Sequence, residues 1–157
     1  MSPSSEILEA STPAQIDYVR ALFREYQAQL PAPLRFPDQE WVNLPGEYAA
    51  PEGALLMATV AGLPAGCVGL RPFPLAGASE MKRLYVRPGF RGYRLGKTLV
   101  EEVIAVARRK GYLRLRLDTH VDTMQSAVDL YRRFGFREIA PEPMTPVPGL
   151  SCMELLP

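Results

Sequence analysis

Two periods of apolar residues run along the chain and predict where its helices and strands lie. Apolar residues spaced three and four positions apart predict an amphipathic helix that begins after an N-cap at Ser11 or Thr12. Its apolar stripe consists of Ile16, Val19, Phe23, Tyr26 and Leu30. The same period predicts a helix over residues 95–110 and a third over residues 123–134. These three segments are the long helices that we expect in the fold.

Shorter apolar runs predict strands between and around these helices. A hairpin is expected where Gly62 and Pro64 separate two apolar runs, and a short helix capped by Asp38 is expected to extend to Leu44. The order of elements predicts an α/β fold with at least one strand–helix–strand crossover and antiparallel hairpins at its ends, in a single domain of residues 1–157. The predicted strands cover residues 6–10, 54–61, 67–73, 79–87, 113–118, 136–139 and 150–156.

Composition narrows the class of protein. The 18 Lys and Arg residues nearly balance the 17 Asp and Glu residues, and a net charge of +1 lacks the basic surplus typical of proteins that bind nucleic acid, so no nucleic-acid partner is expected. Cys67 and Cys152 lie far apart and His120 is the single histidine, so no metal site is predicted. Without an apolar run near the ~20 residues that cross a bilayer, and without a basic segment before an apolar one at its start, the chain is expected to be cytoplasmic with no membrane partner.

A loop rich in glycine and arginine joins the strand that ends near Val86 to the helix that starts near Leu95. Its sequence, VRPGFRGYRLGKTL, contains three glycines and three arginines. Successive backbone N–H groups at a helix N-terminus, left uncovered because glycine has no Cβ, form an anion site, so we expect a phosphate ligand. The alternative is a tight turn made by Gly89 and Gly92 with solvated arginines.

Two kinds of phosphate-binding loop fit this segment differently. A P-loop requires GxxxxGK[ST], and the GKT that begins at Gly96 supplies its end. The residue five positions before Gly96 is Arg91, however, and the nearest glycine, Gly92, leaves only three residues between. Arg114 and Arg116 also interrupt the continuous apolar run expected of a buried parallel strand. A P-loop nucleotide hydrolase is therefore a remote alternative.

The spacing R-x-x-x-x-G fits the loop better and is one of two motifs that occur in order. It runs from Arg91 to Gly96, is preceded by LYVRP and is followed by an amphipathic helix. After one further predicted strand comes YRRFGF, from Tyr131 to Phe136. With these motifs the chain resembles the GNAT superfamily of acyl-CoA-dependent N-acetyltransferases, and the resemblance is strong over residues 54–139.

The resemblance implies a mixed, mostly antiparallel sheet with a central splayed parallel strand pair, flanked by helices. The strand of residues 82–86 would separate from the strand of residues 113–118, and the thioester of acetyl-CoA would lie between them. Two residues depart from the family's pattern. A usual glycine is Arg94 here, which would be strained if the position has a positive φ, and a usual asparagine is Met124.

The resemblance also implies which residues bind acetyl-CoA. Main-chain groups of Leu84, Tyr85 and Val86 would pair with the pantetheine arm, while the side chains of Leu84 and Val86 would join the core. Gln125 or Ser126 would replace the hydrogen bond that the family's asparagine makes. The pyrophosphate would lie on the loop and the first turn of the helix after it, namely on Arg91, Gly92, Tyr93, Arg94, Leu95, Gly96 and Lys97.

Acetylation of an amine requires a group that accepts the proton of the ammonium and a group that protonates the departing thiolate. The resemblance implies Glu80 as the base, directly or through water, and Tyr131 as the acid. The alternative for Glu80 is a surface glutamate at a strand end, and the alternative for Tyr131 is a ring packed beneath an amphipathic helix. His120 lies just past the strand that faces the amine, although a single histidine in such a turn is more often a cap or solvated.

The expected function is transfer of the acetyl group of acetyl-CoA to a primary amine, by direct attack through a tetrahedral intermediate. The amine would belong to a small molecule, an amino acid or a peptide N-terminus. Tyr26, Phe36 and Trp41 either line the acceptor pocket or pack in the core. A sensor of the same fold that binds acyl-CoA without turnover stays open, because it needs the loop but neither proton carrier. A homodimer stays open as well.

Overall fold

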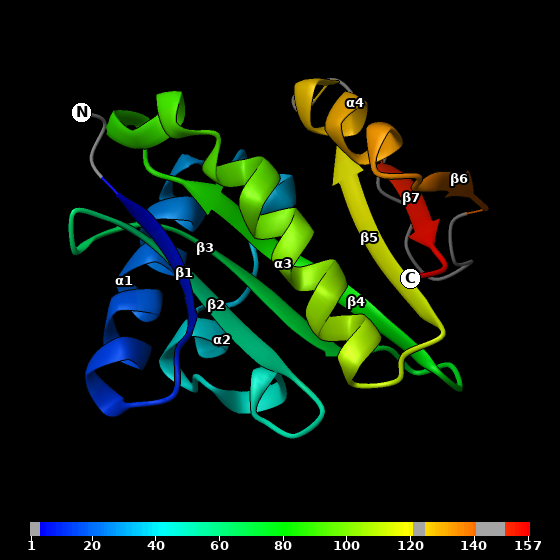
Figure 1. Cartoon of the computed structure of the whole chain (residues 1–157), viewed down its shortest axis with the longest axis horizontal. Helices are drawn as coiled ribbons and strands as arrows, with labels where there is room; N and C mark the ends of the chain where they lie inside the picture. Colours follow the sequence, from blue (N-terminus) through cyan, green and yellow to red (C-terminus); the bar gives the residue numbers. More distant parts are fainter. Residues whose placement is uncertain (1–3, 121–124, 141–149) are drawn as a thin grey trace.

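A seven-stranded sheet runs through the computed structural model, which describes residues 4–120, 125–140 and 150–157 (Figure 1). The strands are β1 (Ser5–Glu9), β2 (Ala54–Val60), β3 (Leu63–Pro72), β4 (Ala78–Val86), β5 (Arg114–His120), β6 (Arg137–Ile139) and β7 (Leu150–Leu155). The α-helices are α1 (Pro13–Gln29), α2 (Asp38–Val42), α3 (Leu95–Arg109) and α4 (Gln125–Arg133). The short 3-10 helices in the described residues are η1 (Ala32–Leu34), η2 (Gly46–Tyr48) and η3 (Pro88–Tyr93).

The strand order in the sheet is β1-β2-β3-β4-β5-β7-β6. Among the described strands, β4 and β5 form the one parallel pair, and all other neighbours are antiparallel. Because a parallel pair needs a crossover, α3 lies between these two strands in the chain. The predicted mixed, mostly antiparallel sheet with a central parallel pair is confirmed. A P-loop hydrolase needs a parallel sheet, so that alternative is wrong.

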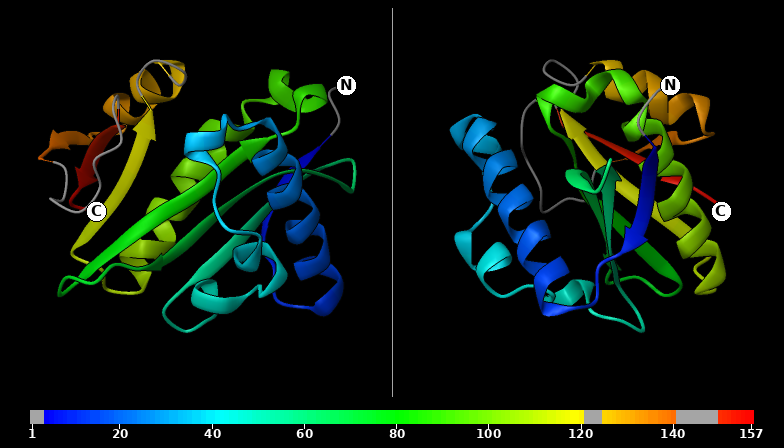
Figure 2. Two further views of the ribbon diagram at one scale, coloured as in Figure 1. Left: turned by 180° about the vertical axis from the view of Figure 1, so that it is seen from behind. Right: turned by 60° about the vertical axis from the view of Figure 1, so that its left-hand side comes forward.

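Helices cover both faces of the sheet (Figure 2). Helices α1 and α2 lie on one face, while α3 and α4 lie on the other. Strand β2 is buried along its whole length because it is covered from both sides: Leu55 and Met57 pack with α1, and Leu56 and Ala58 pack with α3. In the part of the chain that the structure describes, no helix is long and apolar enough to cross a membrane.

Local signals placed most element ends correctly, with two corrections. Of the two predicted N-caps, Ser11 and Thr12, the structure has Thr12, which forms a capping box with Gln15 at the start of α1. Asp38 is the first residue of α2 rather than its cap, and this helix ends at Val42. The hairpin turn is also tighter than predicted, because Val60 pairs with Leu63.

The tight hairpin turn consists of Ala61 and Gly62. Both residues have a positive φ, of 51° and 80°, which is the conformation that two-residue hairpin turns require. This short turn leaves Pro64 inside β3, paired with Thr59, where the sequence analysis had expected a turn. The register of the two strands then shifts between Thr59 and Ala58.

A bulge interrupts β4 at its centre. Arg83 has a φ of 61°, and the register with β3 shifts between Cys67 and Gly69. A bulge increases the local twist and bends the strand that contains it. Strand β4 follows β3 past this bend, but its parallel pairing with β5 covers only the positions from Ala78 to Glu80. The two central strands therefore separate beyond Glu80.

The close contact of β3 with Tyr48 gives a test of the packing on the α1 side. A Cβ added at Gly69 would lie 2.5 Å from Cε1 of Tyr48, whose ring is buried and packs edge-on against Phe23. We expect Gly69→Ala to lower the free energy of unfolding by about 1–3 kcal/mol, measured by urea denaturation.

Gly89→Ala is the matched control, because a Cβ at Gly89 would meet no atom within 4 Å. Its effect on the free energy of unfolding should stay within about 0.5 kcal/mol. Equal stability of the two variants would mean that Tyr48 moves aside without cost.

Candidate active site

Strands β4 and β5 separate beyond Glu80 (Figure 1). A cleft of about 790 Å³ passes between them. Residues of both strands line it, together with residues of α1, the loop before α3, and α4. Six of the residues predicted from the sequence lie on its walls, namely Leu84, Tyr85, Val86, Arg91, Gly96 and Tyr131. The tertiary structure thus brings the two sequence motifs to one cavity.

One end of the cleft is the loop that was predicted to bind a phosphate. Arg94 is the N-cap of α3 in the left-handed conformation, with φ 56° and ψ 31°, so the strain anticipated at this position is present. The first N–H groups of a helix have no partner inside it, and those of α3 follow directly. A Cβ at Gly92 or Gly96 would meet no atom within 4 Å, so the backbone at both glycines is open to a ligand.

The remaining loop residues have other surroundings. Leu95 is fully buried in the core between the sheet and α3. Tyr93 is partly exposed with its ring 6.2 Å from that of Phe90, and Lys97 is exposed and pairs with Glu101. The walls of the cleft do not include Gly92, Tyr93, Arg94, Leu95 or Lys97. The side chains of His120, Gln125, Ser126 and Met124 lie outside the described part of the structure.

Tyr131 is a buried phenol on the cleft wall. It projects from α4 with 6% of its surface exposed, and its ring packs edge-on against Phe136 at 5.8 Å. Burial, with a smaller contribution from Tyr26, raises the pKa of Tyr131 above the usual value for a tyrosine. The phenol is therefore protonated at neutral pH and suited to donate a proton or a hydrogen bond.

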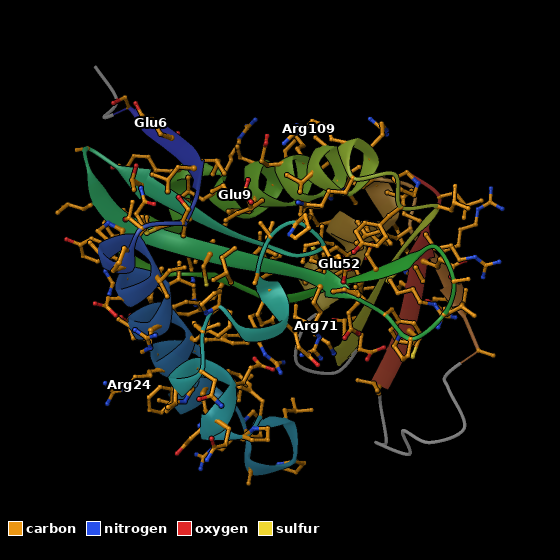
Figure 3. All side chains as sticks on the ribbon, turned by 90° about the horizontal axis from the view of Figure 1, so that it is seen from below. Glu6, Glu9, Arg24, Glu52, Arg71 and Arg109 are labelled. Carbon is orange, nitrogen blue, oxygen red and sulfur yellow. The ribbon has the colours of Figure 1, made fainter. Side chains whose placement is uncertain are left out.

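Glu80 is buried, contrary to the alternative of a surface glutamate. Its exposed fraction is 8%, and Arg71 Nε donates to its Oε1 at 2.6 Å. Nζ of Lys82 lies 3.7 Å from the other carboxylate oxygen. Figure 3 shows Arg71 on the side of the sheet that α2 covers. Glu80 thus lies on the opposite face of the sheet from Tyr131.

A second cavity, of about 370 Å³, lies beside Glu80. Leu117 and Asp118 line both this cavity and the larger cleft, so the two adjoin where β4 and β5 separate. The walls combine two carboxylates and the guanidinium of Arg116 with an apolar surface, and the lining residues are Phe73, Pro74, Leu75, Glu80, Arg116, Leu117, Asp118, Ile139, Ala140 and Cys152. This cavity offers both carboxylate oxygens and apolar carbon atoms to a small molecule.

Ion pairs that the sequence analysis did not predict fix the face around Glu80. Arg83, at the bulge, donates to both carboxylate oxygens of Glu40 on α2 at 2.6 and 2.9 Å, and its guanidinium stacks 3.8 Å from the centroid of Phe36. Arg71 pairs with Glu40 at 3.4 Å as well as with Glu80. These partners are far apart in sequence, so no local motif could have indicated them.

Lys82 and Asp118 are two further site residues that sequence reasoning missed. Nζ of Lys82 lies 3.6 Å from Oδ2 of Asp118, so this pair joins β4 to β5 across the opening. The sequence did contain one indication that Lys82 lies near Glu80. The two residues are two positions apart on a predicted strand, so their side chains must share a face. Of the three aromatic candidates, Tyr26 lines the cleft, whereas the walls of neither cavity include Phe36 or Trp41.

Comparisons with known proteins agree with this geometry. Residues 16–136 match the Acetyltransferase (GNAT) family. An uncharacterized N-acetyltransferase of Schizosaccharomyces pombe is 39% identical over 159 residues, which cover 99% of this chain and 97% of that protein. The chain therefore belongs to the GNAT acetyltransferase family, and it is an acyltransferase.

Solved structures share the fold. An acetyltransferase of Salmonella typhimurium, in complex with its cofactor acetyl-CoA, superposes with a TM-score of 0.77 at 20% identity, over 97% of this chain and 93% of that one. An N-acetyltransferase of Thermoplasma acidophilum in complex with coenzyme A superposes with a TM-score of 0.73 at 21% identity, over 96% and 98% of the two chains. At this level of identity the likeness concerns the fold alone.

The left-handed conformation of Arg94 leads to a stability prediction. Only glycine adopts this conformation without steric cost, so Arg94→Gly should be more stable than Arg94→Ala by about 1 kcal/mol in the free energy of unfolding. Both variants lose the guanidinium, and they differ only in the Cβ. Urea denaturation of the pair measures the difference, and equal stability would show that the backbone here is unstrained.

Proposed function

We propose that residues 1–157 act as one domain that transfers the acetyl group of acetyl-CoA to a primary amine by direct attack. The observation that carries this proposal is the cleft itself, which connects the anion-binding loop at the start of α3 with the carboxylates at Glu80 through the opening between β4 and β5. Such a passage lets two substrates approach from opposite faces of the sheet. The complex of the Salmonella structural relative with acetyl-CoA supports it.

The described residues fit acetyl-CoA. Backbone N–H groups at the start of α3 and the cation of Arg91 hold the pyrophosphate, with open space at Gly92 and Gly96 for close approach. Tyr93, Arg94, Leu95 and Lys97 contribute through their backbone positions in the same loop and first turn. Ser126, at the start of α4, takes the role of the family's asparagine.

The edge of β4 that faces the cleft provides the second part of the binding site. In the described strands, pairing of β4 with β5 ends at Glu80, so the main-chain groups of Leu84, Tyr85 and Val86 face the cleft without a neighbouring strand on that side. They bind the pantetheine arm, whose amide groups would otherwise lose their hydrogen bonds to water. The side chains of Leu84 and Val86 pack against the core.

Two groups on opposite faces of the sheet move the protons. Glu80 accepts the proton of the incoming ammonium, directly or through water, and Arg71 holds its carboxylate in one orientation. Tyr131 donates its phenolic proton, which its raised pKa keeps on the oxygen at neutral pH, to the departing thiolate. The proton that the attacking nitrogen releases returns to the phenolate. Coenzyme A, with its free thiol, then leaves through the same cleft.

The acceptor amine binds in the smaller cavity. Its ammonium lies near Glu80 and Asp118, and its carbon skeleton packs against the apolar wall that includes Phe73, Leu75 and Ile139. A relative in Sus scrofa is named as a thialysine N-epsilon-acetyltransferase, and thialysine carries a primary amine. This relative is 36% identical over 59 residues, which cover 38% of this chain and 34% of that protein. Small amines and amino acids with a free primary amine are the acceptors that this cavity favours.

Binding of acetyl-CoA at the loop is tested through Gly96. At about a hundredfold excess over Kd, acetyl-CoA should stabilise the parental protein by about 2.7 kcal/mol, measured as a rise in Tm. Gly96→Val should fold with a similar Tm, because no described atom lies within 4 Å of its Cβ, but should lose most of this rise. Val adds bulk where the backbone approaches the pyrophosphate.

Gly89→Val is the matched control for Gly96→Val, because Gly89 is equally open but is not on the cleft wall. Acetyl-CoA should raise the Tm of the Gly89→Val variant as it raises that of the parental protein. ATP with magnesium should raise the Tm of either variant much less than acetyl-CoA raises the Tm of the parental protein. A folded Gly96→Val protein with unchanged affinity for acetyl-CoA would contradict the proposed binding site.

The role of Tyr131 is tested by removing its hydroxyl. Tyr131→Phe should lower kcat at least about tenfold while the affinity for acetyl-CoA and Tm change little, because the lost interaction is made mainly in the transition state. Steady-state kinetics with free-thiol detection measure this. If the tyrosine only packs, Tm should fall by an amount that corresponds to about 1 kcal/mol and kcat should hold.

A further inference from the structure

Lys82 places a primary amine of the protein itself at the junction of the two cavities. The chain has three lysines, Lys82, Lys97 and Lys110, among 18 basic residues. Lys82 is on the wall of the larger cleft, and its Nζ lies 3.7 Å from Glu80 and 3.6 Å from Asp118, the two carboxylates of the smaller cavity. Nζ therefore occupies the environment that the acceptor ammonium needs.

The other two lysines differ from Lys82 in each of these respects. Lys97 is 54% exposed, on the surface of α3, and pairs with Glu101 one turn further along. Lys110 lies at the far end of α3, where its Nζ donates to the carbonyl oxygen of Pro51 at 2.7 Å. The walls of the two cavities include neither of them. The exposed fraction of Lys82 is 18%, so it faces the cleft rather than bulk solvent.

We propose that Lys82 is a site of self-acetylation, modified by acetyl-CoA bound in the cleft when no external amine occupies the smaller cavity. This inference rests on the proposed function, because it uses the same thioester and the same base. Glu80 and Lys82 share one face of β4, and Arg71 fixes the Glu80 carboxylate beside Nζ. The opening between the strands is where a thioester held by β4 must deliver its acetyl group.

The reaction balances with acetyl-CoA as the only co-reactant. The Lys82 ammonium gives one proton to Glu80 or Asp118, which passes it to solvent. The free amine attacks the carbonyl carbon, so that an N–C bond forms and the C–S bond breaks. Tyr131 protonates the departing thiolate and regains a proton from the second N–H of the attacking nitrogen, and the products are acetyl-lysine and free coenzyme A.

Acetylation of Lys82 would change the charge at the opening. It removes the positive charge that lies between Glu80 and Asp118 and ends the ion pair between β4 and β5. Arg71 continues to pair with Glu80. The smaller cavity thereby becomes more negative, which favours a cationic acceptor.

Mass spectrometry of the full chain with isotopically labelled acetyl-CoA and no amine tests the proposal. We expect one acetyl group per chain, mapped by peptide analysis to Lys82 and incorporated faster than at the more exposed Lys97. Lys82→Arg keeps the charge and should reduce incorporation to the level of uncatalysed labelling. Lys110→Arg is the matched control and should leave labelling of Lys82 unchanged.

Dependence on the cleft separates enzymatic from chemical acetylation. Gly96→Val should slow labelling of Lys82 but leave slow chemical labelling of Lys97 unaffected. Equal labelling of the three lysines, or labelling of Lys82 that Gly96→Val does not alter, would overturn the proposal.

A parallel assay with external amines distinguishes failure of this inference from failure of the proposed function. An unmodified Lys82 in a protein that acetylates external amines would overturn self-acetylation alone. A protein that neither binds acetyl-CoA nor acetylates any amine would overturn both.

Discussion

The positive φ of Arg83 in the middle of β4 is the backbone constraint on which the cleft depends. A non-glycine residue in this conformation costs free energy and persists where its surroundings determine it. Here the bidentate ion pair with Glu40 and the stacking on Phe36 provide those surroundings. With the bulge in place, β4 keeps its partner β3 and separates from β5, and the space between them becomes the cleft.

The sheet divides the candidate active site into two environments. On the α4 side, Tyr131 is surrounded by apolar side chains of the core. On the α1 and α2 side, Glu80 belongs to a network of charges with Arg71 and Lys82. The two environments adjoin at Leu117 and Asp118, which line both cavities at the opening between the strands.

The charge network around Glu80 restricts side-chain orientation more than it stabilises the folded state. Moving charges out of water carries a desolvation cost that an ion pair only partly offsets, so a partly buried pair such as Arg71 and Glu80 is weak evidence for stability. What the pair does is limit the rotamers of Glu80, and Lys82 with Asp118 does the same across the opening. In the proposed mechanism, a base that is held in one orientation needs less reorganisation when the substrate binds.

Sequence reasoning identified the parts of the site that are encoded locally. The loop from Arg91 to Gly96, the start of α3 at Leu95 and the position of Tyr131 on a helix all follow from residues within one turn or one motif. It left open whether Glu80 lies at the surface, and could not show that its surroundings are buried and ionic, because Arg71 approaches from a neighbouring strand. It also missed Lys82 and Asp118 as a pair, since their contact depends on how β4 and β5 meet.

The sequence by itself determined the order of helices and strands, the glycine-rich loop before α3 and the membership of an acyltransferase family, because hydrophobic period, glycine positions and short motifs act over a few residues. It even indicated the strain at Arg94, which is set by the backbone of one residue. The tertiary structure alone decided where the sheet opens and which charges surround the opening. These depend on contacts such as that of Glu40 with Arg83, which are 43 residues apart, and side chains so distant in sequence meet only when the layers of the fold have packed.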